Sequence, residues 1–186
     1  YPDGIDPATG RRLEVTLELG GATPDVRQVV ELMAGMFDKI GVVLNASYNN
    51  WPAFLGKMDR RQAQMFQLGW VADYPDAENF LQLFYSANAS PGPNHANYAN
   101  PEFDKLYDRM RTLLPGPEKD RICEQMADIV IEDCPWIFLY QPMEFAVVHN
   151  WLKNYSLHDF PYTMVKYRRV DNAVWNEWKA KHGREN

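Results

Sequence analysis

Two hydrophobic periods follow each other in the first 48 residues. Residues 13–19 alternate apolar and polar side chains, which predicts a strand with one buried face and one wetter face that carries Glu18. Thr23 has the residue type of a helix cap, and apolar residues then recur at helical spacing. A second apolar run, residues 42–44, comes directly afterwards. Because parallel strands need a crossover connection, usually a helix, residues 13–48 predict a βαβ unit.

The next stretch ends in residues 69–80, a segment called the corner below, from which a function is predicted. Residues 65–70 form a short, bulky apolar run that is typical of a buried strand. Pro75 suits the first turn of a helix, because its ring fixes φ and the missing N–H would go unused there. Asp73 then lies between the carboxyl end of the strand and the helix. In open α/β sheets this is the position at which ligands bind.

The second half of the chain predicts a loop, two helices and a strand. Residues 86–100 are rich in Ser, Asn, Pro and Gly, so we expect a loop that serves a function or is mobile. Amphipathic helices are predicted over 101–114 and 118–133, with Lys119 on the outer face of the second. Residues 136–140 are apolar on both faces, as in a central strand. The fold class is therefore α/β, with a βαβ-containing mixed sheet flanked by helices.

Composition and charge narrow the range of partners. The chain has 186 residues, 46% of them hydrophobic, which is ample for a packed core. Its formal charge of -6, without clustered Lys and Arg, argues against nucleic acid as a partner. No apolar run approaches the roughly 20 residues that cross a bilayer, and no signal-peptide pattern is present. Because the chain opens on Tyr1 without an initiator Met, we expect a piece of a longer protein. Any membrane association would then come from an anchor or a permease outside this segment.

Asp73 is the main candidate for chemistry, and two roles fit it. Its carboxylate can receive an ammonium or hydroxyl group of a ligand, with Trp70 and Tyr74 supplying apolar walls and a polar tip. It can equally cap the helix that follows, and the two roles are compatible if different oxygens are used. Asp76 and Glu78 are so close to the helix start that interaction with the helix dipole is the favoured role.

Catalytic and metal sites find little support in the sequence. The four histidines have no paired ligand spacing, and no Cys-x-x-Cys is present. A Gly-x-Ser-x-Gly turn and a Gly-rich loop ending in Lys-Ser/Thr are both missing. Nothing indicates two opposed acids at the separation that glycoside cleavage requires. We therefore expect no enzyme, no metal site and no cofactor, and a hydrolase built on the acidic corner is the weakest alternative.

Several separated motifs resemble a known family. They are Tyr1-Pro2-Asp3-Gly4 with Asp6-Pro7-Ala8-Thr9-Gly10, then Gly69-Trp70, Ala72-Asp73-Tyr74-Pro75-Asp76 and Asn79-Phe80, and finally Tyr98-Ala99-Asn100-Pro101-Glu102-Phe103-Asp104 and Cys134-Pro135-Trp136-Ile137-Phe138-Leu139-Tyr140. Their order resembles the carboxyl-terminal portion of the family 5 extracellular solute-binding proteins, the oligopeptide, dipeptide and nickel binders of ABC importers. The resemblance covers residues 1 to about 170. One departure is Ala77, where the family signature often has a second proline.

The resemblance implies a type II periplasmic-binding-protein-like lobe. Residues 1–170 would form the second lobe of a two-lobed clamshell, and residues 171–186 a tail. Such a protein captures a peptide or similar small solute between its lobes and delivers it to a membrane permease, in the periplasm or at the cell surface. In peptide-binding relatives the aspartate at the position of Asp73 pairs with the ligand's amino terminus, and Trp70 and Tyr74 would line the same edge. A ligand-sensing regulatory module that uses the same lobe is the alternative, and the sequence does not fix which solute is bound.

Overall fold

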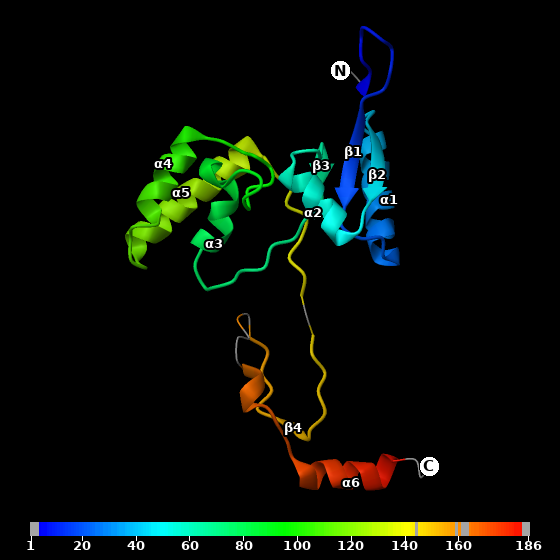
Figure 1. Cartoon of the computed structure of the whole chain (residues 1–186), viewed down its shortest axis with the longest axis vertical. Helices are drawn as coiled ribbons and strands as arrows, with labels where there is room; N and C mark the ends of the chain where they lie inside the picture. The colour runs from blue at the N-terminus through cyan, green and yellow to red at the C-terminus, as the bar shows by residue number, and fades with distance from the viewer. Residues whose placement is uncertain (1–3, 144, 159, 161–163, 184–186) are drawn as a thin grey trace. The chain divides into compact units, whose positions relative to one another are not determined.

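The computed structural model consists of two units (Figure 1). The residues that it describes are 4–143, 145–158, 160 and 164–183. Unit 1 contains the described residues up to Val71 together with Asp76–Trp136, and unit 2 contains Ala72–Pro75 and the residues from Ile137 onwards. Residues 1–3 of the first predicted motif lie outside the described residues.

Unit 1 combines a small parallel sheet with a group of helices. Its elements, in chain order, are β1 (Glu14–Leu19), α1 (Pro24–Asp38), β2 (Val43–Tyr48), α2 (Trp51–Asp59), β3 (Met65–Phe66), α3 (Glu78–Leu81), the 3-10 turns η2 (Gln82–Phe84) and η3 (Ser86–Asn88), α4 (Pro101–Met110) and α5 (Pro117–Asp133). Within the described residues, no helix is both long enough and apolar enough to cross a lipid bilayer.

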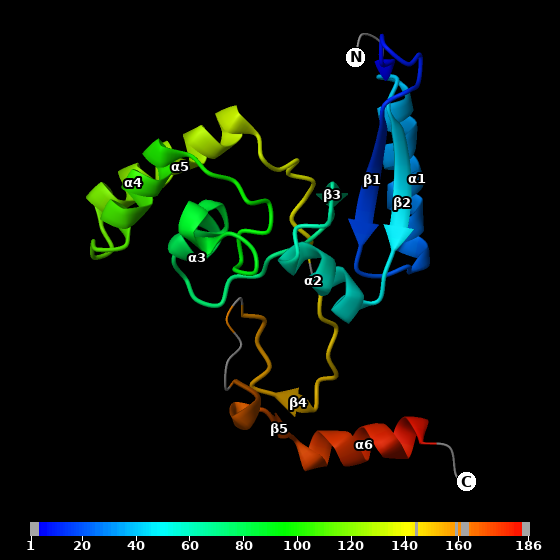
Figure 2. The same ribbon diagram turned by 45° about the horizontal axis from the view of Figure 1, so that its top comes forward.

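The predicted βαβ unit is confirmed. β1 lies between β2 and β3 and pairs in parallel with both, with Leu17 opposite Ala46 of β2 and Met65 of β3. Figure 2 shows β1 and β2 side by side and pointing the same way, with α1 running along them. Val30 of α1 packs against Leu17 and Leu19 in a buried cluster. Because side chains alternate along a strand, the same register turns Glu18 to the opposite face of the sheet.

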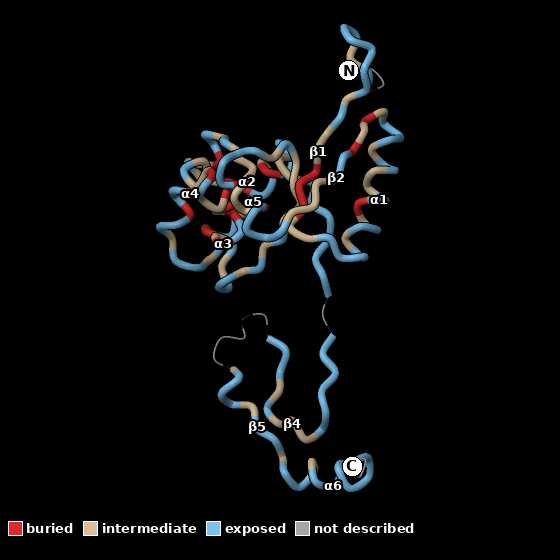
Figure 3. The backbone as a smooth tube through the Cα atoms, turned by 45° about the vertical axis from the view of Figure 1, so that its right-hand side comes forward, coloured by how far each residue is buried: buried red, intermediate tan, exposed pale blue. Residues whose placement is uncertain are grey.

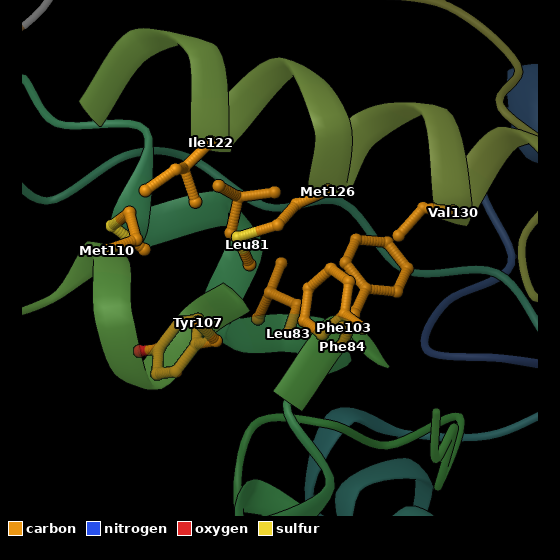
Figure 4. Packing of buried hydrophobic residues seen from close by; sticks show 9 residues of the cluster. All are labelled: Leu81, Leu83, Phe84, Phe103, Tyr107, Met110, Ile122, Met126 and Val130. Carbon is orange, nitrogen blue, oxygen red and sulfur yellow. The ribbon is translucent and has the colours of Figure 1, made fainter. Parts of the chain in front are cut away.

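The larger core lies among the helices of unit 1. Nine buried residues form it: Leu81, Leu83, Phe84, Phe103, Tyr107, Met110, Ile122, Met126 and Val130 (Figure 4). They come from α3, η2, α4 and α5, and their spacing on α4 and α5 is the one that the amphipathic pattern predicts. In Figure 3 the buried residues accordingly gather along β1 and in the helices of unit 1.

The loop over residues 86–100 is held by one buried amide. The Asn94 side chain is 0% exposed. Its Nδ2 donates to the carbonyl oxygens of Tyr85 at 3.0 Å and Tyr98 at 2.9 Å, and its Oδ1 accepts from the Tyr98 amide at 3.2 Å. Arg61 adds a hydrogen bond to the Ser90 carbonyl at 3.1 Å. The two ends of this loop are therefore joined through a single side chain, in a position where unmade hydrogen bonds would be costly.

Two predictions of strands are wrong in whole or in part. β3 contains only Met65 and Phe66, and the chain continues to Trp70 outside any strand. The predicted central strand over 136–140 is irregular, with Phe138 61% and Tyr140 70% exposed. A strand forms only where a neighbouring strand offers its backbone groups, and an apolar pattern cannot show whether such a neighbour exists.

Unit 2 has an aromatic cluster in place of a buried core. It contains β4 (Leu152–Lys153), η4 (Met164–Tyr167), β5 (Arg169–Val170) and α6 (Asn172–His182), and β4 pairs with β5 antiparallel. None of its described residues is buried (Figure 3). The ring of Trp151 lies 4.7 Å from that of Trp175 and 4.8 Å from that of Trp178, centroid to centroid. The tail is thus a helix that packs through its tryptophans on the chain around β4.

Candidate functional site

Trp70 is anchored in unit 1 through both its ring and its nitrogen. The ring packs against the helical core, and its Nε1 donates to Oδ1 of Asn79 at 2.9 Å. Asn79 lies in α3 and is 1% exposed. A buried amide that accepts from an indole fixes the orientation of the ring, because both groups would otherwise be left without their hydrogen bond.

Asp73 and Tyr74 belong to the short stretch Ala72–Pro75 of unit 2. Both are exposed, Tyr74 by 41%. The prediction that a helix begins at Pro75 is wrong, because α3 begins at Glu78 with Ala77 at its N-cap position. The alternative role of Asp73 as the cap of a helix starting at Pro75 is therefore wrong as well. The departure from the family signature at Ala77 falls at this helix start, where a second proline would have fixed φ.

Asp76 and Glu78 connect the start of α3 to α5 and α4. Lys119 of α5 donates to Oδ2 of Asp76 at 2.5 Å, and Oδ1 of Asp76 accepts from the Glu78 amide at 2.9 Å. The Tyr107 hydroxyl of α4 donates to the Glu78 carboxylate. Lys119, predicted on an outer face, is in fact buried beside Asp76. The sequence misplaced it because a lysine stem can cross apolar surface to reach an acid from another element.

The electrostatics of Asp76 follow from this pairing. Burial by itself raises the pKa of the Asp76 carboxyl, but the hydrogen bond from Lys119, the Glu78 amide and the lysine charge outweigh it. The net result is a pKa below the usual value. Asp76 is therefore a charged structural anchor that pairs with Lys119 of α5, whereas the sequence favoured an interaction with the helix dipole.

A small apolar cavity lies next to Trp70. Its volume is about 10 Å³, close to the minimum that holds one water molecule. The residues that line it are Phe66, Leu68, Gly69, Trp70, Leu83, Pro93, His95 and Trp136, all of them in unit 1. A cavity of this size cannot enclose a solute, so a binding site at Trp70 needs walls beyond those that line it.

Sequence reasoning missed a second polar cluster, at the carboxyl end of β1. Oε2 of Glu18 accepts from Lys57 Nζ and from Asn49 Nδ2, each at 2.7 Å, and Lys57 Nζ lies 3.4 Å from Ser47 Oγ. Glu18 is only 6% exposed although it was predicted on the wetter face of the strand. Burial raises its pKa, but the hydrogen bonds from Lys57, Asn49 and Ser47 and the lysine charge hold it below the usual range. The available signal in the sequence was Lys57, the lysine of α2. Residue spacing alone could not show that it pairs with an acid of β1.

Metal ligands do not converge in the part of the chain that the structure describes. In those residues, no group of three or more His, Cys, Asp or Glu side chains is placed to hold a metal ion. The polar clusters around Asp76 and Glu18 can form ion pairs and hydrogen bonds through their carboxylates, next to aromatic rings.

Comparison with known proteins adds a family to this geometry. Residues 1–92, about half of the chain, match the model of the bacterial extracellular solute-binding proteins, family 5, middle part. The chain belongs to this family. The type II periplasmic-binding-protein-like fold class and the resemblance drawn from the motifs are therefore confirmed, and the family consists of binding proteins rather than enzymes.

Relatives within the family match most of this chain. Di/tripeptide-binding protein 4 of Pseudomonas aeruginosa is 27% identical over 87% of the chain and 32% of its own length. Heme-binding protein A of Haemophilus influenzae is 26% identical over 87% of the chain and 29% of its own length. The oligopeptide-binding protein AppA of Bacillus subtilis, solved in complex with a nonapeptide, shares the fold with a TM-score of 0.71 at 24% identity, over 90% of this chain and 34% of that one. The chain thus spans about a third of the length of these family members.

Proposed function

We propose that this chain is the second, carboxyl-terminal lobe of a substrate-binding component of an ABC importer. The observation that carries the proposal is the match of 87% of the chain to a di/tripeptide-binding protein, together with the likeness to a solved oligopeptide-binding protein. The protein captures a peptide or similar small solute in a cleft between two lobes and delivers it to a membrane permease. Its location is the periplasm or the cell surface, and it carries out no catalysis.

Asp73 is the residue that we propose to receive the ligand's ammonium group. Its support is the signature Ala72-Asp73-Tyr74 in the family pattern and its exposure in the structure. An aspartate on the solvent side of the corner is accessible to a ligand, and closing a second lobe over it would remove water from the ion pair. Charge-assisted hydrogen bonds gain strength in such surroundings, which makes a free amine a sharp criterion for binding.

A calorimetric comparison tests this function and the role of Asp73 together. A tripeptide of alanine and phenylalanine with a free amino terminus is titrated into the full-length protein, next to its N-acetylated form. Asp73→Asn should weaken the binding free energy of the peptide with the free amino terminus by about 2–5 kcal/mol, as loss of one member of a desolvated charge pair does. Asp128→Asn, an exposed aspartate on α5, is the matched control and should bind like the wild type.

Each outcome has a separate meaning. Equal binding of the free and acetylated peptides, or unchanged affinity of Asp73→Asn, removes Asp73 from the site but leaves the solute-binding role. Absence of binding to any peptide argues against the peptide ligand. The isolated 186-residue chain should bind weakly or not at all, because one wall of the cleft is missing from it.

A further inference from the structure

Helix α2 is tethered to the end of β1 at two points. At one, Lys57 donates to the buried Glu18 carboxylate at 2.7 Å. At the other, the Trp51 ring lies against Gly20, where an added Cβ would come within 2.8 Å of the ring. Since α2 rises about 1.5 Å per residue, the two points are about 9 Å apart along the helix. Phe54 and Met58 of α2 are buried as well, and two attachments at this separation add a constraint on both the position and the tilt of the helix.

Asn49, the residue after β2, also donates to the Glu18 carboxylate. Its side chain donates to Glu18 and to the Ser47 carbonyl, at 2.7 and 3.0 Å, and its amide donates to the Leu19 carbonyl at 2.9 Å. Asn50, the next residue, caps α2 by accepting from the Ala53 amide at 2.9 Å. The Glu18 carboxylate is therefore the point at which the ends of β1 and β2 and the body of α2 meet.

Trp51 stands where this helix meets the carboxyl edge of the sheet. It is the first residue of α2, three positions after the end of β2, and 52% exposed. The carboxyl ends of parallel strands are the edge at which α/β proteins bind ligands. A large aromatic ring exposed there, but held against a glycine on one side, offers a rigid apolar surface to a solute.

We propose that Glu18 is a positioning residue that acts through Lys57 to hold α2 and thereby sets Trp51 at the solute-binding edge. This inference rests on the proposed solute-binding function. In this pair the Glu18 side chain is buried at 8% exposure and the Lys57 side chain is 30% exposed. An ion pair with a buried carboxylate is seldom a gain in stability over apolar residues of the same volume, so its presence here calls for another role. Fixing the helix that presents Trp51 is the role that the contacts supply.

Fluorine NMR of the full-length protein labelled with fluorotryptophan reads the position of Trp51 directly. The resonance is assigned with Trp51→Phe. Glu18→Gln and Lys57→Met should each shift it, and Gly20→Ala should shift it by direct contact as a positive control. Glu14→Gln is the matched control, since Glu14 lies on the same face of β1 but is exposed, and its carboxylate accepts a hydrogen bond from Asn45 at 3.0 Å.

Affinity and stability are measured on the same variants. The tripeptide of alanine and phenylalanine should bind Glu18→Gln about tenfold more weakly, a change that corresponds to about 1.4 kcal/mol. The double variant Glu18→Leu with Lys57→Met removes the pair altogether and should recover much of the stability lost in the single variants. It should nevertheless keep the shifted Trp51 resonance and the weakened binding.

The outcomes separate positioning from stability and from the proposed function. If the double variant is stable and has both the wild-type Trp51 resonance and the wild-type affinity, the pair does not position Trp51 and the inference is overturned. A shifted resonance with unchanged affinity overturns the link to the solute. If the wild type binds no peptide, the peptide-binding function fails, whereas an unmoved resonance in Glu18→Gln refutes the positioning role on its own.

Discussion

Lys119→Met should destabilise unit 1 because it leaves the Asp76 carboxylate without its cation. Lys119 reaches Asp76 from α5 at 2.5 Å, with side-chain exposures of 11% for the lysine and 29% for the aspartate. Methionine keeps most of the apolar stem and removes the charge, so the substitution tests the ion pair rather than the packing. Fully buried pairs lose about 3–5 kcal/mol when one partner is removed and exposed pairs at most about 1. Because the exposure of Asp76 is intermediate, we expect Lys119→Met to lower the free energy of unfolding by about 2 kcal/mol.

The assay is urea unfolding followed by far-ultraviolet circular dichroism, which reports on the helices of the protein, α4 and α5 among them. Asp76→Asn keeps the oxygen that accepts from the Glu78 amide, so the double variant with Lys119→Met should cost about 1–2 kcal/mol less than the sum of the single variants. Lys105→Met, an exposed lysine of α4, is the matched control and should change stability by less than about 0.5 kcal/mol.

The pH dependence of this loss has a definite sign. The pKa of Asp76 in the folded state is lowered, so the carboxylate stabilises the fold above its unfolded pKa of about 3.9 and ceases to do so as the pH falls through the folded value. The difference between wild type and Lys119→Met should therefore be largest at neutral pH and shrink below about pH 4. Additive single variants, or a loss that is equal at acidic and neutral pH, would refute the pairing.

Three further results are expected. Asn94→Ala should cost about 2–4 kcal/mol, because a buried amide with three hydrogen bonds is lost, and hydrogen exchange should show faster exchange across residues 86–100. Burial and the nearby Asp133 carboxylate raise the pKa of Tyr98 to about 12; Asp133→Asn should bring it back toward its usual value of about 10, as ultraviolet titration of the phenol measures. Trp151→Ala should release α6, since a helix of this length is marginal alone, and hydrogen exchange should lose its protection there while unit 1 stays unchanged.

The sequence predicts the local parts of this fold well. The alternation over 13–19 and the apolar spacing of the helices are properties of neighbouring residues, and β1, α1 and α5 appear where those patterns place them. α4 begins at Pro101 as predicted but ends at Met110, before the predicted end at residue 114. Asn100 shows this at a helix start, where its Oδ1 accepts from the Glu102 amide at 2.9 Å, as its residue type predicts.

Long-range pairing is what the sequence could not supply. Glu18 looked like a solvent-facing residue of an amphipathic strand, but in the fold it is buried, and Lys57 of α2 and Asn49 donate to its carboxylate. Lys119 is misplaced for the same reason, with Asp76 as the distant partner. Residues 136–140 have the composition of a central strand but lack strand pairing in the described structure. For Glu18 and Lys119 the partner lies 39 and 43 residues away along the chain, and for residues 136–140 the described residues provide no neighbouring strand. Periodicity carries no information about either.

The candidate site was predicted from a motif, and the structure refines it. Trp70 is a rigid, part-buried support and Asp73 an exposed carboxylate in the turn that follows. The helix start that seemed to compete for Asp73 lies at Glu78 instead. The ligand-binding role of Asp73, Trp70 and Tyr74 stays a prediction, as does the assignment of residues 1–170 to one lobe.

Native mass spectrometry of the full-length protein, freshly purified from its own host, tests the central claim most directly. We expect a co-purifying small molecule that carries a free amine and is lost from Asp73→Asn but kept by Asp128→Asn. A retained molecule without an amine would contradict the role of Asp73 and leave solute capture standing. A protein that retains nothing and binds no peptide in calorimetry would contradict the proposed role in peptide uptake itself.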